Sequence, residues 1–232
     1  MVEKIKKNDF IEIGFKGTSN GEIFDTTNPE EAKEIGIEAD VKPIIASVGN
    51  EMVLKGLDEN LEDKEVGKKY SIHLTPDKAF GPRNPQMIKT IPIKVFTEKN
   101  LNPQPGMVFQ LDQSLVRIIS VSGGRVMADF NNPLAGKEVD YEFKINKIIS
   151  DNKEKINALQ DFFFRQRFEF ELRDKKVIFK DDKIKPIIDV FNKKFKEMTG
   201  LEFEVSEKQD KVEEEKPKEK KQENKVDNSK QQ

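Results

Sequence analysis

The feature that most constrains the fold is an alternation of apolar and polar residues in short segments that end at turn-forming residues. Residues 10–15 carry apolar side chains close to the period of two that a half-buried β-strand requires. Asn20 and Gly21 follow, and both tolerate a positive φ, so a tight hairpin turn is predicted there. The alternation returns at residues 139–145 and places Tyr141 on the same face as its apolar neighbours. These segments predict antiparallel strands that share one core.

Helical spacing appears in two places. Leu54, Leu57 and Leu61 recur at intervals of three or four, which predicts a short helix that ends at Gly67. A longer helix ending at Gly200 is predicted from five residues on one face, Ile184, Ile187, Ile188, Phe191 and Phe195. We therefore expect an α+β chain with a separate small α+β C-terminal domain.

Changes in composition divide the chain into parts. A proline-rich start and two apolar runs joined at Gly123 and Gly124 predict a β-hairpin in residues 84–130. The other parts are residues 1–83, a return to strand at 131–151, a C-terminal unit at 152–206 and a tail at 207–232. The tail has eight lysines and eight acidic residues but only two apolar ones, so we expect it to be disordered.

Residues 84–130 contain six soft or aromatic side chains that either fill a small β core or contact apolar partners. We expect most of them to lie in the core. They are Met87, Phe96, Met107, Phe109, Met127 and Phe130. The C-terminal unit, at about fifty residues, is near the lower limit for independent folding, so we expect it either to dock on the first domain or to form a homodimer.

Composition excludes several functions. The chain has no cysteine and one histidine, which excludes a disulfide scaffold, thiolate metal sites and a cysteine nucleophile. That histidine, His73, is predicted to face outward from a strand. A formal charge of −2 argues against a nucleic-acid-binding surface. No apolar run approaches membrane-spanning length and the first residues lack a signal pattern, so we expect a cytoplasmic protein without membrane contact.

The motifs of common catalytic classes are also missing. There is no G-x-S-x-G nucleophile elbow, no phosphate-binding loop and no dinucleotide fingerprint after a strand. What remains is a set of apolar and aromatic residues near strand ends around one acidic residue. They are Phe15, Phe24, Asp25, Ile44, Val53, Leu54, Phe80 and Tyr141. Taken singly, such aromatic residues are ordinary core residues, and Asp25 is a plausible turn residue.

Several of these residues lie in longer motifs. V-L-K-G-L-D-E-N-L (53–61) precedes E-V-G-K-K-Y-S-I-H-L-T-P-D-K-A-F-G (65–81), and the pair F-D (24–25) follows the Asn-Gly turn. With these motifs the chain resembles the FK506-binding-protein (FKBP) type of peptidyl-prolyl cis/trans isomerase. The insertion between A-F-G and N-N-P-L-A-G (131–136) is similar to the SlyD-like branch, in which a chaperone domain is inserted in the flap, and the C-terminal unit is similar to the long archaeal type.

The resemblance implies a small antiparallel sheet that wraps on a short helix, in a domain made of residues 1–83 together with 131–151, with a β-rich insert domain at 84–130. It also implies an apolar pocket that catalyses without a metal or other cofactor. It assigns catalytic positions to all eight residues of the set above and adds Leu57 as the pocket floor. Phe15 and Phe80 stand where relatives usually have tyrosine, whereas Tyr141 stands where they have phenylalanine. The hydrogen bonds that relatives make through those two hydroxyls are therefore lost. SlyD relatives carry histidine-rich metal-binding tails, and the Lys/Glu tail here implies no comparable nickel or zinc binding.

Two functions remain open on this basis. The first is an isomerase with a built-in chaperone, in which the insert captures unfolded polypeptides and the pocket isomerises their X-Pro bonds. The second is a non-catalytic holdase whose pocket only binds polypeptide. The expected partners are unfolded or partly folded chains that contain X-Pro bonds.

Overall fold

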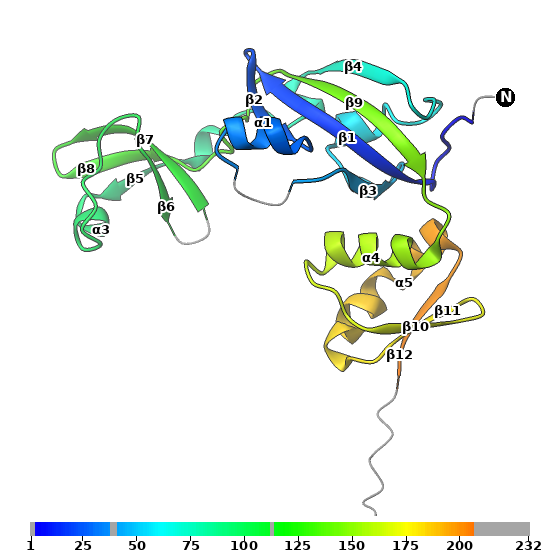
Figure 1. The fold of residues 1–232 in the computed structure, drawn as a ribbon. Helices are drawn as coiled ribbons and strands as arrows, with labels where there is room; N and C mark the ends of the chain where they lie inside the picture. Colours follow the sequence, from blue (N-terminus) through cyan, green and yellow to red (C-terminus); the bar gives the residue numbers. More distant parts are fainter. Residues whose placement is uncertain (1–2, 38–40, 112–113, 207–232) are drawn as a thin grey trace, which may run out of the picture.

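A computed structural model describes residues 3–37, 41–111 and 114–206. The described chain forms three separate sheets, each accompanied by helices (Figure 1). The five-stranded sheet lies between the other two. The four-stranded sheet of the insert projects to one side of the five-stranded sheet, and the C-terminal unit lies against the opposite end of that sheet (Figure 1). The α+β class expected from the sequence is confirmed.

The five-stranded sheet belongs to the first domain. Its strands are β1 (Phe10–Ser19), β2 (Glu22–Thr26), β3 (Ile44–Ser47), β4 (Lys69–Leu74) and β9 (Val139–Ile148). They run in the order β2-β1-β9-β4, and β3 pairs with the first half of β1. All pairs are antiparallel. The hairpin turn at Asn20 and Gly21 has positive φ at both residues, as the sequence predicts.

Helix α2 (Lys55–Asp58) packs on this sheet and is shorter than expected. Leu57 and Leu61 are both fully buried, but the chain leaves the helix after Asp58. Beyond the helix the hydrogen bonds span three residues, as from the Leu61 N–H to the Asp58 carbonyl at 3.1 Å, and Asp63 has a φ of 62°. The apolar spacing was therefore correct for burial and wrong for helix length. Helix α1 (Pro29–Glu34) and the 3₁₀ helix η1 (Pro76–Lys78) complete the domain.

The insert forms an antiparallel sheet in the order β5-β8-β7-β6. The strands are β5 (Ile88–Pro92), β6 (Val108–Leu111), β7 (Ser114–Ser122) and β8 (Arg125–Asp129), with helix α3 (Lys94–Thr97) and the 3₁₀ helix η2 (Pro85–Met87). The hairpin between β7 and β8 turns at Gly123 and Gly124, both with positive φ. Its core gathers around Phe96, which is fully buried.

The expectation for the soft residues of the insert was correct for the phenylalanines and wrong for the methionines. Phe96 is buried, and Phe109 and Phe130 pack against its cluster. The three methionines are exposed, at 38% for Met87, 42% for Met107 and 41% for Met127. The reason for Met127 is strand parity, because Val126 and Ala128 on either side of it fill the core.

The C-terminal unit contains helices α4 (Asn152–Phe163) and α5 (Lys185–Thr199) and the 3₁₀ helix η3 (Asp182–Ile184). Its sheet has the order β10-β11-β12, from β10 (Phe170–Arg173), β11 (Lys176–Phe179) and β12 (Glu202–Val205). Helix α5 ends at Gly200 in the left-handed conformation, φ 72°, as the sequence predicts. Strands β11 and β12 are parallel, whereas β10 and β11 are antiparallel.

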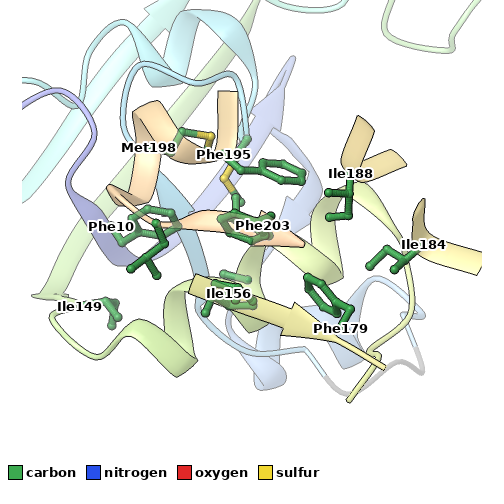
Figure 2. Packing of buried hydrophobic residues seen from close by; sticks show 14 of the residues in the cluster. Phe10, Ile149, Ile156, Phe179, Ile184, Ile188, Phe195, Met198 and Phe203 are labelled. Atoms are coloured by element: carbon green, nitrogen blue, oxygen red, sulfur yellow. The ribbon is translucent and has the colours of Figure 1, made fainter. Parts of the chain in front are cut away.

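This unit docks on the first domain through a shared hydrophobic core. Phe10, Ala46 and Met52 of the first domain belong to the same buried cluster as Ile156 of α4 and Phe203 of β12. Figure 2 shows Phe203 in the centre of this cluster, with Phe10 and Ile149 at the left and Met198 above Phe10. The docking expected from the size of the unit is therefore observed. The tail at 207–232 lies outside the described residues.

Candidate active site

Four aromatic rings from three strands and a loop form a chain of edge-to-face contacts at one end of the five-stranded sheet. Phe15 and Tyr141 have ring centroids 5.8 Å apart at 62°. Phe24 contacts Tyr141 at 5.7 Å and 83°, and Phe80 at 5.6 Å and 81°. Edge-to-face geometry places the positive edge of one ring on the negative face of the next, which stabilises the pairs beyond their buried area.

Strand register explains how the rings meet. Gly17 of β1 lies between two partners, opposite Asp25 in β2 and opposite Tyr141 in β9. A Cβ atom at Gly17 would lie 2.7 Å from Cζ of Phe24 and 3.1 Å from Cε1 of Tyr141. Only glycine leaves room for both rings. The sequence reasoning missed Gly17, although the F-K-G run that contains it was visible.

The remaining apolar candidates line the same cluster. Leu57 is fully buried, and its neighbours in the cluster are half-buried. These are Ile44 at the start of β3, and Val53 and Leu54 just before α2. Ile72 of β4, which the sequence reasoning did not single out, also packs here and lies directly opposite Tyr141. The structure therefore brings together all the apolar candidates.

Backbone contacts hold two of these residues in place. Phe15 donates its N–H to the Thr27 hydroxyl at 2.7 Å and accepts the Thr27 N–H at 2.9 Å. Gly56 in α2 approaches β4 so closely that a Cβ would lie 2.6 Å from Cδ2 of Leu74. This contact presses α2, and Leu57 with it, against the sheet.

Asp25 is the ionisable group beside the rings. It is half-buried, and burial raises the pKa of its carboxyl, with a smaller opposing effect from a backbone hydrogen bond at Thr26. Burial also raises the pKa of the Tyr141 phenol, and the charge of Asp25 raises it further. The phenol is therefore neutral at physiological pH and lies within electrostatic range of the carboxylate.

A backbone donor without a hydrogen-bond partner among the described residues lies just before α2. Leu54 is the residue before the helix, with φ −53° and ψ 134°, and its carbonyl accepts the Asp58 N–H at 2.9 Å. Its own N–H donates to no acceptor in ranges 3–37, 41–111 and 114–206. Backbone donors of buried or half-buried residues are normally paired. Because this N–H has no partner among the described residues, it can donate to a ligand.

His73 lies outside the cluster, as the sequence predicts. It is exposed, and its Nδ1 lies 2.8 Å from Oδ1 of Asp140 and its Nε2 3.4 Å from Oε2 of Glu138. The hydrogen bond with Asp140 is the main cause that raises the pKa of this imidazole, and the charges of both carboxylates add to it. No group of three metal-ligating side chains occurs within the described part of the chain.

The arrangement suits a site that acts on its ligand through non-covalent contacts and forms no covalent bond with it. It offers aromatic and aliphatic walls, one carboxylate with a raised pKa and one free amide donor. Such a site excludes water from a neutral peptide group and can stabilise a rearranged form of it through contacts alone.

Two family models match the chain. The FKBP-type peptidyl-prolyl cis-trans isomerase model matches residues 2–97, and the model of the FKBP26 IF domain matches residues 89–134. The described part of the chain contains no helix that is long and apolar enough to span a membrane.

Curated relatives agree with these matches. The chain is 32% identical over 151 residues to the short-type peptidyl-prolyl cis-trans isomerase of Methanocaldococcus jannaschii, which covers 64% of this chain and 96% of that protein. It is 27% identical over 153 residues to the FKBP-type 16 kDa isomerase of Escherichia coli K12, with coverage of 64% and 96%. It is 27% identical over 139 residues to SlyD of Aeromonas hydrophila, with coverage of 59% and 60%.

The fold and the site thus define a peptidyl-prolyl isomerase. The chain belongs to the FKBP family, in its SlyD-like branch with an insert in the flap.

Proposed function

We propose that the chain is a folding catalyst that captures unfolded polypeptide on its insert and isomerises the X-Pro bonds of that polypeptide in the aromatic cluster. The observation that carries this proposal is the exposed apolar face of the insert sheet. The face consists of side chains that are 37–55% exposed, and they are Val108, Leu115, Ile119 and Met127.

The core of the insert does not need these side chains. The opposite face of the same strands fills the core, with Val116, Ile118 and Val126 packed around Phe96. Exposed apolar side chains gathered on one sheet face are typical of an interaction surface. Methionine suits a surface that contacts many sequences, because its flexible side chain adapts its shape at little cost.

The isomerisation step requires no covalent bond to the enzyme. An X-Pro bond rotates over a barrier of about 20 kcal/mol, because amide resonance gives its C–N bond partial double-bond character. Hydrogen bonds from water to the carbonyl favour the charge-separated form and strengthen that character. Transfer of the proline into the cluster removes this water, so we infer that the twisted transition state is bound better than either planar isomer.

Two polar groups have roles in this step. The free N–H of Leu54 donates to a carbonyl of the bound peptide and fixes its position. Asp25 stands beside the rings, where its charge favours the electron distribution of the twisted amide. Phe15, Phe24, Ile44, Val53, Leu57, Phe80 and Tyr141 form the apolar walls.

The connection between the insert and the first domain supports a joint action. Gly136 donates its N–H to the Gly81 carbonyl at 2.8 Å, one residue after Phe80. Arg83 pairs with Asp129 at 2.5 Å where the chain enters and leaves the insert. A captured segment therefore stays near the cluster, which raises the effective concentration of its prolyl bonds there.

The experiment compares a protein substrate with a short prolyl peptide. In the double variant Ile119→Ser, Met127→Ser, we expect kcat/KM to fall strongly for a refolding protein limited by prolyl isomerisation and to stay unchanged for the peptide. Val190→Ser is the matched control, because Val190 is 73% exposed on α5, away from the insert. Equal loss on both substrates, or no loss on the protein, contradicts capture by the insert.

A further inference from the structure

A small notch lies at the junction of the insert and the segment that returns to the first domain. It has a volume of about 160 Å³ and lies between strands β6 and β7 and residues 131–137. Its apolar wall includes Val108 and Leu115, which are 50% and 55% exposed. The notch is therefore continuous with the exposed apolar face of the insert.

The charged groups of this notch are mostly positive. Arg83, Arg117 and Lys137 line it together with one carboxylate, that of Asp129. Asp129 is already occupied, since it accepts hydrogen bonds from Arg83 at 2.5 Å and from the Asn131 side chain at 2.6 Å.

Two of the cations have no such partner. Arg117 and Lys137 form no ion pair with any residue of the described ranges. Arg117 lies directly opposite Val108 in the β6–β7 register, so its guanidinium and the Val108 side chain share one sheet face. An unpaired cation thus stands beside an exposed apolar side chain.

We propose that this notch binds an acidic side chain of the captured polypeptide, with the neighbouring apolar side chain of that polypeptide packed on Val108 and Leu115. The inference rests on the capture function proposed above and names its preferred segment, an acidic residue next to an apolar one. The positive charge of the notch favours a carboxylate as its ligand, because guanidinium groups bind carboxylates through paired hydrogen bonds.

The position of the notch determines which prolines of a bound segment lie near the aromatic cluster. Lys137 adjoins Gly136, whose N–H is bonded to the residue after Phe80. A segment anchored by its acidic residue therefore lies at the edge of the insert nearest to the aromatic cluster. Prolines a short distance along the chain from that residue are presented to the cluster first.

The test uses the full chain and two labelled, extended, proline-free peptides. The peptides differ only in carrying Glu or Gln beside a leucine. We expect the Glu peptide to bind about two- to fivefold more tightly at low salt, as for an exposed ion pair, and the difference to shrink at high salt. Arg117→Gln should remove the difference while both peptides still bind.

The matched control is Arg125→Gln. Arg125 is an exposed cation on the same sheet, at the far end of β8, and does not line the notch. It should leave the Glu preference intact. The acidic-residue preference of the notch is overturned if both peptides bind the unaltered chain equally, or if the two arginine variants have the same effect. Either result leaves the proposed capture of unfolded polypeptide by the insert in place. Failure of both peptides to bind removes the capture function and the notch with it.

Discussion

Phe24 and Tyr141 meet edge to face at 5.7 Å across Gly17, a position of β1 where a Cβ atom would collide with both rings. The aromatic cluster therefore depends on one residue that contributes no side chain to it. This relationship links strand register to the proposed chemistry, because the gap at Gly17 decides where the two rings stand.

The variant Gly17→Ala tests this dependence. The added methyl group lies 2.7 Å from Phe24, so the ring must move, at a cost of about 1–3 kcal/mol in unfolding free energy. We expect kcat/KM for a short prolyl peptide to fall as well. Gly14→Ala on the same strand is the control, because its Cβ meets Thr27 at an ordinary 3.4 Å. The unfolding free energy is measured in urea and kcat/KM with the prolyl peptide for both variants. Equal values for Gly17→Ala and Gly14→Ala would contradict the dependence of the cluster on Gly17.

Asp25→Asn separates stability from activity. Burial raises the folded-state pKa of Asp25 above its unfolded value, so the protonated form favours folding and this contribution is lost as pH rises through the folded pKa. At neutral pH the ionised carboxylate opposes folding, and we expect the amide variant to be at least as stable. Isomerase activity should fall about tenfold, equivalent to about 1.4 kcal/mol. A less stable variant with full activity would refute both roles.

His73 provides a pH-dependent contact between β4 and the start of β9. Because Asp140 and Glu138 favour the imidazolium, its pKa lies above 6.5 in the folded state. The stabilisation is fully present below the unfolded pKa and is lost as pH rises through the folded one. Since the chain has one histidine, its ring proton resonances report this pKa directly by NMR. Asp140→Asn should lower the value, and an unchanged titration would contradict the contact.

Phe10→Ala tests the docking of the C-terminal unit. Phe10 is 1% exposed within the cluster that joins the two domains. We expect the free energy of unfolding to fall by about 3–5 kcal/mol. We also expect faster proteolytic cleavage near Ile149, where the chain passes between the domains. Phe10→Leu, which keeps most of the volume, is the control and should cost less. A proteolysis pattern identical to that of the unaltered chain contradicts the shared core.

Much of the first domain could be predicted from the sequence, because strand alternation and the Asn-Gly turn are local signals. The order of the motifs also indicated which residues could lie together, and the structure places the apolar candidates in one cluster. The role of Gly17 was not visible, because it depends on two partner strands, one of them more than a hundred residues away.

Other features depend on contacts that no local pattern encodes. The exposure of Met127 follows from strand parity, because Val126 and Ala128 on either side of it fill the core, and composition alone favoured the core for Met127. The ion pair of Arg83 with Asp129 joins residues at the two ends of the insert. A homodimer through residues 152–206 stays a prediction, to be checked by the mass in solution of the full chain and of a chain ending at 151.

Catalysis by the aromatic cluster can be measured as the refolding rate of a protein limited by prolyl isomerisation, in the presence of the unaltered chain and two variants. We expect acceleration by the unaltered chain and by Tyr141→Phe, which keeps the ring and loses only the hydroxyl. We expect near-uncatalysed refolding with the double variant Phe80→Ala, Tyr141→Ala, which opens the cluster to water. Full acceleration by that double variant, or none by Tyr141→Phe, would contradict catalysis by an apolar aromatic enclosure.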